Sequence, residues 1–263
     1  MAGKKKEEKE IIKPLVGEAP DYSVYYPGVW ERIGWFLIGA AAGAIVMYIF
    51  LESIAASCIA GIITGIIFIP MRRKQIVDKR KKQLLTQFRG LLDALSTSVG
   101  AGRNITDAFL SAESDLTVQF SADSYIVNEI RCIGLGVNNN IQIEDLLMNF
   151  AQRSGLEDVE SFANVFATCY KKGANIQEVI KNSAAIIGDK IEIQMELETM
   201  VAGQKNEQNI MLVMPVVLIV AMKAMGGDMI DLSTPTGVAS VTTALVIFVL
   251  AYFVSKKILD IKL

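Results

Sequence analysis

Two long apolar stretches near the ends of the chain enclose a middle part of mixed polarity. In the first stretch, from Ile33 to Met71, Glu52 is the only acidic residue and there is no Lys or Arg. As a single helix this stretch would be nearly twice as long as the ~30 Å hydrocarbon core of a bilayer requires, so we expect it to fold back near Glu52 and Ser53. The pattern predicts a transmembrane helical hairpin over residues 33–71.

The two helices of this hairpin, Ile33 to Leu51 and Ile54 to Ile69, each carry two glycines spaced four residues apart. The candidate packing residues are Gly39, Gly43, Gly61 and Gly65. Small residues at this spacing let two backbones approach closely in lipid. Ordinary glycines of membrane helices would give the same pattern. Because the second helix is short, a re-entrant hairpin is the alternative.

A second apolar pair, residues 210–225 and 238–254, is separated by a loop over residues 226–237 that contains two Asp and no Lys or Arg. This pattern predicts a second transmembrane hairpin, over residues 210–254, with residues 226–237 as its external loop. Pro215 is a candidate packing residue in the third membrane helix.

A dense basic run directly after the first hairpin predicts the orientation of the chain in the membrane. Its candidate topology or partner-contact residues are Arg72, Arg73, Lys74, Lys79, Arg80, Lys81 and Lys82. Cytoplasmic loops are rich in Lys and Arg, which places residues 72–209 in the cytoplasm. The run lacks interleaved aromatic residues and adjoins a membrane helix, so it favours contact with anionic lipids over nucleic acid.

Both tails are predicted to be cytoplasmic. Residues 1–32 are charged at their start and are interrupted by Pro14, Pro20 and Pro27, which differs from a signal peptide and is typical of a flexible tail. Residues 255–263 include three lysines. The charge bias therefore agrees with a multi-pass protein of the cytoplasmic (inner) membrane that has both termini inside.

The middle part has the 3.6-residue periodicity of amphipathic helices, without competing alternation. One apolar stripe, for example, consists of Leu84, Phe88, Leu91, Leu95 and Val99. A further helix is expected to run from Asn175 toward the third membrane segment. The predicted fold class is all-α: a polytopic membrane protein in which two transmembrane helical hairpins flank a cytoplasmic helical bundle of about six helices.

Three helix starts repeat a similar phrase, Asn-Ile followed by one or two residues and then an acid, at residues 104–107, 140–144 and 175–178. Asparagine can cap free amides, and an acid in the first turn complements the positive helix end. The candidate turn residues are Gly102, Asn104, Asp107, Asn140, Gly173, Asn175 and Glu178. A tetratricopeptide-like solenoid is rejected because its Trp, Gly and Tyr pattern is missing.

Composition argues against enzymatic and metal chemistry. The chain has no histidine, and its three cysteines form no CxxC pair. No P-loop motif is present, which excludes an ATPase. Gly226-Gly227-Asp228 fails the Gly-x-Gly-Asp signature of intramembrane aspartyl proteases because Met225 precedes it. These absences disfavour many enzyme classes, and we expect no cofactor. The acids of the middle part, Glu129 and Glu144 among them, are expected to lie mostly on a solvated surface.

Four segments in order carry a family resemblance: Gln87-Phe88 through Leu95, then residues 101–109, residues 172–180, and Met214-Pro215. The order resembles the type II secretion system F domain, specifically the tight-adherence (Tad) pilus platform proteins, over residues 84–220. One departure is Asn138-Asn139-Asn140 at the middle turn, where the family has Gly. Asparagine tolerates left-handed geometry, so we expect this turn to be kept.

The resemblance implies that residues 72–209 are a single cytoplasmic F domain of an inner-membrane platform. Such a protein belongs to a Tad or type IV-like pilus or a type II secretion machine. The implied partners are a pilus or secretion ATPase, pilin subunits, and a second platform protein or further copies of this chain. An oligomeric membrane transporter or channel subunit is the alternative, although few polar residues lie near the middle of the predicted membrane helices.

Overall fold

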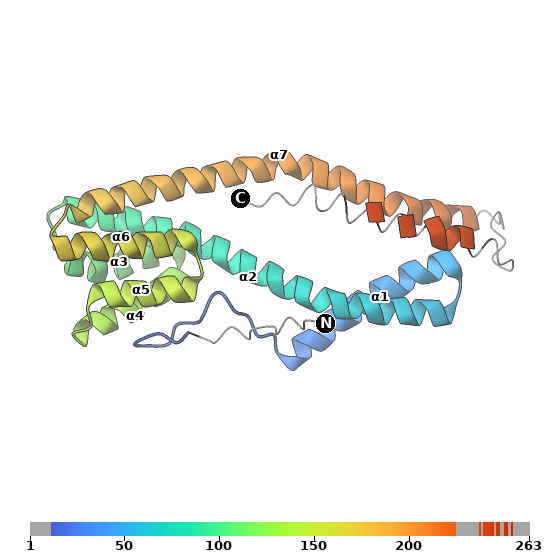
Figure 1. Ribbon diagram of the computed structural model, residues 1–263, viewed down its shortest axis with the longest axis horizontal. Coiled ribbons are helices and arrows are strands. Elements are labelled where there is room, and N and C mark those ends of the chain that lie inside the picture. Colours follow the sequence, from blue (N-terminus) through green and yellow to red (C-terminus); the bar gives the residue numbers. More distant parts are fainter. Residues whose placement is uncertain are drawn as a thin grey trace, which may run out of the picture. The chain divides into compact units, whose positions relative to one another are not determined.

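The computed structural model describes residues 12–224 and, in the C-terminal part, residues 237, 239–244, 246–247, 250, 251 and 254. Every regular element in these residues is an α-helix, which confirms the all-helical prediction. The helices are α1 (Val29–Leu51), α2 (Ile54–Gly100), α3 (Ile105–Phe120), α4 (Tyr125–Asn138), α5 (Ile143–Ser154), α6 (Glu157–Lys172) and α7 (Ile176–Ala224) (Figure 1). All residues of the predicted external loop 226–237 except the last, and the whole tail 255–263, lie outside the described residues.

The chain divides into two compact units. The first, here the bundle unit, comprises Met1–Tyr26 and Lys74–Glu192, and the second, here the apolar unit, comprises Pro27–Arg73 and Ile193–Leu263. The chain therefore passes from one unit to the other three times. Two of the passages fall inside α2 and α7, which are each a single uninterrupted helix.

The bundle unit is built around apolar faces that the sequence periodicity predicts. Leu84, Phe88, Leu91 and Leu95 of α2 are fully buried, while Val99 is partly buried against the same core. The ring of Phe88 meets Phe162 of α6 edge-on, with 5.5 Å between centroids. Burying an aromatic or leucine side chain stabilises a fold by about 1.5–3 kcal/mol, so this stripe is a main source of stability for the unit.

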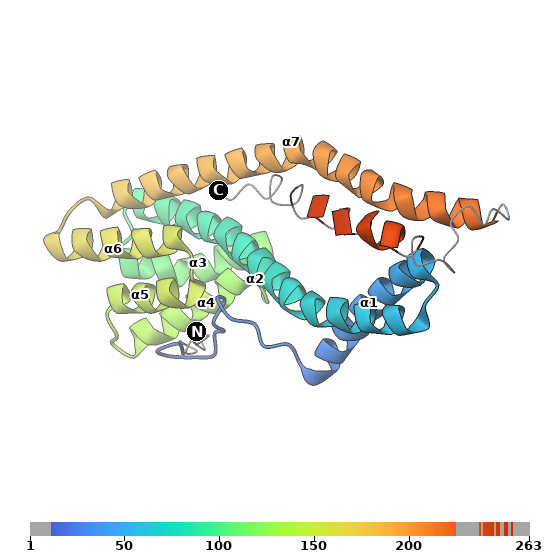
Figure 2. The same cartoon turned by 45° about the vertical axis from the view of Figure 1, so that its right-hand side comes forward.

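Helix α2 differs from the separate elements that the sequence predicts. The hairpin helix expected to end at Ile69 continues without a break through the basic run into the bundle and ends at Gly100. Lys, Arg and Gln dominate the intervening residues, and they have high helix propensity. Pro70 lies inside the helix and does not end it. Figure 2 shows α2 as one continuous ribbon.

In the apolar unit, α1 and the first part of α2 form an antiparallel pair joined at Glu52, which adopts left-handed geometry with φ of 52°. All four candidate packing glycines lie at the contact between these helices. A Cβ atom on Gly65 would come within 2.7 Å of the Phe36 ring, and one on Gly61 within 2.9 Å of the Ala40 carbonyl oxygen. Close backbone approach therefore requires glycine at these positions.

Thr64 adds a polar contact to the same helix pair. Its hydroxyl group lies 3.0 Å from the carbonyl oxygen of Gly39 on α1 and 2.9 Å from that of Ala60 on its own helix. A Cβ atom on Gly43 would collide with this threonine side chain. The missing side chain of Gly43 is thus what allows Thr64 to reach across to α1.

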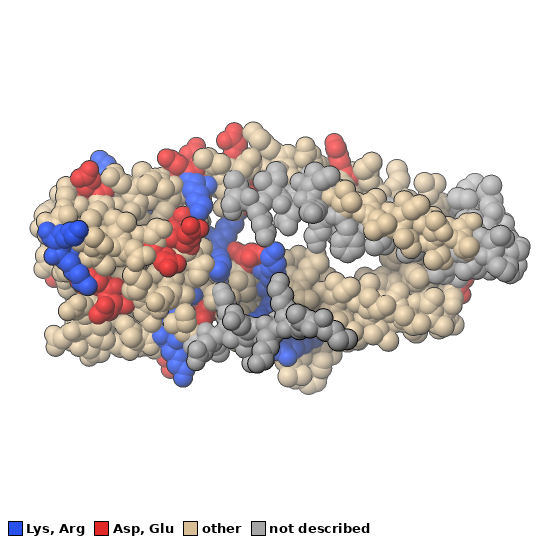
Figure 3. Space-filling view, viewed as in Figure 1, with Lys and Arg blue, Asp and Glu red and all other residues tan. Residues whose placement is uncertain are grey.

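Two helices are long and apolar enough to cross a membrane, judged by length and composition within the described residues. An 18-residue apolar stretch of each helix has a mean hydropathy of 2.1 in α1 and 2.2 in α2, and only 6% and 17% of these stretches are buried. Leu37 and Ile62, for example, are 59% and 54% exposed. Between Ile33 and Met71 the only Asp, Glu, Lys or Arg side chain is Glu52, whereas acidic and basic side chains are scattered over the bundle unit (Figure 3). Exposed apolar surface of this extent is typical of membrane association.

The N-terminal segment differs from the predicted flexible tail. Residues 12–26, here the strap, lie against α4 and α5 of the bundle unit, and Tyr22 is only 1% exposed. α1 then begins at Val29, four residues before the predicted Ile33. The carboxylate of Glu31 accepts a hydrogen bond from the Gly28 N–H and so favours this earlier start.

The glycine contacts predict an unequal response to two alanine substitutions in α1. Gly43→Ala should lower the free energy of unfolding by about 1–3 kcal/mol, because the new methyl group collides with Thr64. Gly34→Ala is the matched control, since nothing lies within 4 Å of a Cβ at that position. It should be neutral or stabilising by about 0.5–1 kcal/mol. Unfolding of the full chain in detergent measures both, and equal effects would contradict the contact.

Candidate functional site

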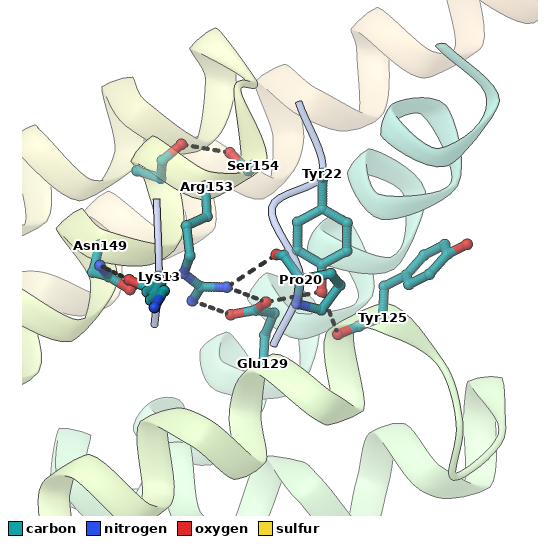
Figure 4. Close-up of polar contacts among 9 residues, drawn as sticks. Lys13, Pro20, Tyr22, Tyr125, Glu129, Asn149, Arg153 and Ser154 are labelled. Carbon is teal, nitrogen blue, oxygen red and sulfur yellow. Dashed lines mark hydrogen bonds and ion pairs between the residues drawn. The ribbon is translucent and has the colours of Figure 1, made fainter. Parts of the chain in front are cut away.

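The most distinctive polar group of the structure is a buried ion pair between Glu129 of α4 and Arg153 of α5 (Figure 4). The guanidinium group donates two hydrogen bonds to the carboxylate, of 2.7 and 2.6 Å. The two side chains are 0% and 3% exposed. This bidentate geometry is the strong form of an arginine–carboxylate pair, and it joins two helices inside the bundle.

Further hydrogen bonds to the pair come from the strap and from α5. The Tyr22 hydroxyl donates to Glu129 Oε1 at 2.8 Å, and Arg153 Nε donates to Asn149 Oδ1 at 2.8 Å. Arg153 Nη1 also lies 3.4 Å from the Pro20 carbonyl oxygen. A buried ion pair tolerates its loss of hydration only when such additional bonds are made. The strap therefore completes the site.

Backbone and ring contacts hold the strap along its length. The Tyr22 N–H donates to the Arg153 carbonyl oxygen at 2.9 Å, and its ring meets Tyr125 edge-on at 5.4 Å between centroids. Nearer the N-terminal end of the strap, Asn149 Nδ2 donates to the Lys13 carbonyl oxygen at 3.0 Å. Gly17 has φ of 79°, and a Cβ there would lie 2.8 Å from the Cys132 sulfur. The fit thus depends on glycine as well as on tyrosine.

Burial and charge at this site shift three pKa values. Burial, followed by the neighbouring Glu129 carboxylate, raises the pKa of Tyr22 far above its usual range, so the phenol remains a hydrogen-bond donor. Burial by itself would lower the pKa of Arg153, but its hydrogen bonds to Glu129 and the charge of that carboxylate outweigh burial and raise it. Burial and Glu129 likewise raise the pKa of the Cys132 thiol, which therefore stays uncharged.

The sequence prediction missed this site. It assigned Glu129 and Glu144 to the solvated surface, whereas they are 0% and 7% exposed. The signal was present for Glu129, because it follows Ile126 by three residues and precedes Ile133 by four, so it shares their apolar face. The spacing of apolar residues does not predict that Arg153 is the partner of Glu129, because this contact depends on how α4 and α5 pack.

The basic run also contributes to local contacts. The Arg80 guanidinium lies over the ring of Tyr25 in the strap, 4.4 Å from its centroid. Lys81 Nζ donates to the Gly155 carbonyl oxygen at 2.7 Å. Arg72 lies over the ring of Phe68, 5.9 Å from its centroid, within the apolar unit. Lys74, Lys79 and Lys82 are exposed and Arg73 is partly buried. Arg80 and Lys81 therefore help to hold the strap and the α5–α6 turn.

Most of the predicted turn residues occupy the positions expected of caps. Asn104 accepts a hydrogen bond from the Asp107 N–H at 3.0 Å, and Asn175 accepts one from the Glu178 N–H at 3.3 Å. Gly102 and Gly173 have φ of 86° and 66°, the left-handed region that favours glycine. These residues position the starts of α3 and α7 and thus fix where the bundle helices turn.

Asn140 differs from the prediction of a helix cap. It has φ of 61° and follows the end of α4, while the N-cap position of α5 is held by Gln142. The Asn140 N–H donates to the Val137 carbonyl oxygen, and the Ile141 N–H donates to that of Gly136, both at 3.0 Å. Asn140 thus ends α4 in the left-handed geometry that asparagine tolerates and does not cap α5.

Pro215 lies inside α7, within the apolar unit. Within the described residues no group of three or more His, Cys, Asp or Glu side chains could hold a metal ion. No family model matches the chain, and no curated protein or solved structure matches it either. The resemblance over residues 84–220 therefore stays a prediction.

The buried ion pair predicts a large loss of stability when one partner is removed. Arg153→Met should lower the free energy of unfolding by about 3–5 kcal/mol, because it leaves the Glu129 carboxylate buried without a cation. The double variant Glu129→Leu with Arg153→Met should recover much of the loss. As a control, Lys190→Met breaks the more exposed pair with Asp158 and should cost about 0–1 kcal/mol. Similar losses for Arg153→Met and Lys190→Met would contradict a buried pair.

The raised pKa of Tyr22 predicts that its contribution to stability decreases at alkaline pH. The folded chain holds the phenolic proton more tightly than the unfolded chain, so this contribution is complete below the ordinary tyrosine pKa of ~10 and is lost above it. The stability difference between the wild type and Tyr22→Phe should therefore shrink by about 1.4 kcal/mol from about pH 9 to about pH 11. Chemical unfolding at both pH values measures it. A difference independent of pH would contradict the buried phenol.

Proposed function

We propose that this protein is an inner-membrane platform of a Tad or type IV-like pilus or a type II secretion machine. In this role the bundle unit lies in the cytoplasm and binds a ring-shaped ATPase, while the apolar unit crosses the membrane and acts on pilin subunits. The protein couples movement and catalyses no reaction itself. Further copies of this chain or a second platform protein, together with membrane lipids, complete the assembly.

The observation that carries the proposal is the threefold chain connection between the two units. α2 and α7 each run without interruption from a charged amphipathic part into an apolar part. The third connection follows the strap, which is bound to α4 and α5 and is followed by α1. A domain held at three points can transmit displacement that a single flexible linker would absorb.

The composition of α2 supports the proposed orientation. Its apolar first part is followed at once by the basic run, in which three lysines stay exposed. Exposed lysines next to a membrane helix favour the cytoplasmic side and contact with anionic lipid headgroups. Under this proposal the protein crosses the membrane several times and has both termini in the cytoplasm.

Site-specific crosslinking in native membranes tests the proposed partners. Val118 of α3 is 91% exposed, and a photoreactive amino acid there should capture an ATPase subunit if the bundle unit binds one. Ile62 of α2, 54% exposed in the apolar unit, is the matched control and should capture pilin subunits or lipid instead.

Two outcomes would overturn the platform proposal. One is capture of no ATPase from Val118 or from other exposed sites on the bundle unit. The other is intact pilin assembly after deletion of this chain in cells where deletion of the ATPase abolishes it. Solute flux through the purified, reconstituted chain would favour the transporter or channel alternative.

A further inference from the structure

A cavity of about 540 Å³ lies at the end of the bundle unit where α3 and α5 begin and α4 and α6 end. Its polar lining residues are Thr106, Gln142, Glu144, Tyr170 and Lys171, and apolar side chains from the α4–α5 turn complete it. The volume falls within the range of small-ligand and side-chain sites, about 300–1,000 Å³. None of these residues takes part in the buried ion pair or in the strap.

Glu144 is the unusual member of this lining. It is 7% exposed, yet in the described part of the chain no hydrogen bond or ion pair involves its carboxylate. Ser124 Oγ is the one fully buried side-chain polar atom without a partner in the described residues, so the carboxylate oxygens of Glu144 keep contact with solvent in the cavity that this residue lines. The carboxylate is thus held in a mostly buried side chain, is accessible from the cavity, and has no cation of its own chain beside it among the residues described. The neighbouring Asp145 occupies the same first turn and is exposed. Asp145 can therefore complement the positive N-terminal end of α5 while it stays hydrated. The charge of this helix end thus does not explain why Glu144 is buried.

The other groups of the cavity fit one kind of cation. Lys171 lines the same cavity, but its side chain is exposed and forms no ion pair with Glu144. Tyr170 is 38% exposed, and its ring is stacked on Phe166 at 5.6 Å between centroids. A cavity that combines a carboxylate, an aromatic ring and apolar walls is the environment that a guanidinium group prefers. This group is planar and weakly hydrated, and it can form two parallel hydrogen bonds with one carboxylate.

We propose that this cavity binds an arginine side chain presented by a partner protein. Glu144 accepts the hydrogen bonds of the guanidinium group, and the apolar walls and Tyr170 contact its flat faces and its methylene stem. Binding supplies the buried carboxylate with the cation that it lacks in the free chain. The apolar walls and the partly exposed ring of Tyr170 favour arginine over lysine, whose ammonium group is strongly hydrated.

Titration of the purified full chain with the capped tripeptide acetyl-Gly-Arg-Gly-amide tests this proposal. The uncharged isostere with citrulline and the peptide with lysine are the comparison probes. The arginine peptide should bind at least about tenfold more tightly than either, as expected for a charge-assisted bidentate contact. Glu144→Gln should remove this preference, whereas the matched variant Asp145→Asn should keep it.

Thermal unfolding of the free chain provides a second measurement. Glu144→Gln should leave the melting temperature unchanged or raise it, because the carboxylate has no partner to lose. Equal binding of the arginine and citrulline peptides would overturn the proposal, as would an arginine preference that persists in Glu144→Gln. A clear drop in melting temperature for this variant, larger than for Asp145→Asn, would also overturn it, since it would show that the carboxylate is already paired within the folded chain.

Discussion

The buried pair of Glu129 and Arg153 is the interaction on which the bundle unit depends. Two charges removed from water are stable only when further hydrogen bonds replace much of their lost hydration. Here the missing partners come from Tyr22 and Pro20 of the strap, more than 100 residues away along the chain. One polar requirement in the core thus fixes α4 against α5 and at the same time holds the N-terminal segment in place.

This arrangement gives the chain two different kinds of internal contact. The bundle unit combines a conventional apolar core with one buried cluster of hydrogen-bonded polar groups, so its helices are specified by hydrogen-bond geometry as well as by side-chain volume. The pair of α1 and the first part of α2 relies instead on glycines and on one threonine hydroxyl. That solution suits helices whose outer surfaces are apolar, because in lipid only close packing and hydrogen bonds favour association.

Much of the helical pattern could be predicted from the sequence, because it depends on local periodicity. The apolar stripe of α2, the caps at Asn104 and Asn175, and the left-handed glycines follow from neighbouring residues. The buried pair did not follow, because a single sequence does not show which acid on an apolar face meets which base. The strap was missed for a similar reason: prolines and charges near Pro14 and Pro20 are typical of a flexible tail, and only the tertiary partner of Tyr22 explains its order.

The position of the strap in the chain has a consequence for biosynthesis. The ribosome releases Tyr22 long before Glu129, 107 residues later, so the strap has no docking site while α1 and α2 are emerging. Its contact can form only once α4 and α5 have been made and have folded together. The strap is therefore synthesised before the bundle helices but reaches its native position only after α4 and α5 have folded.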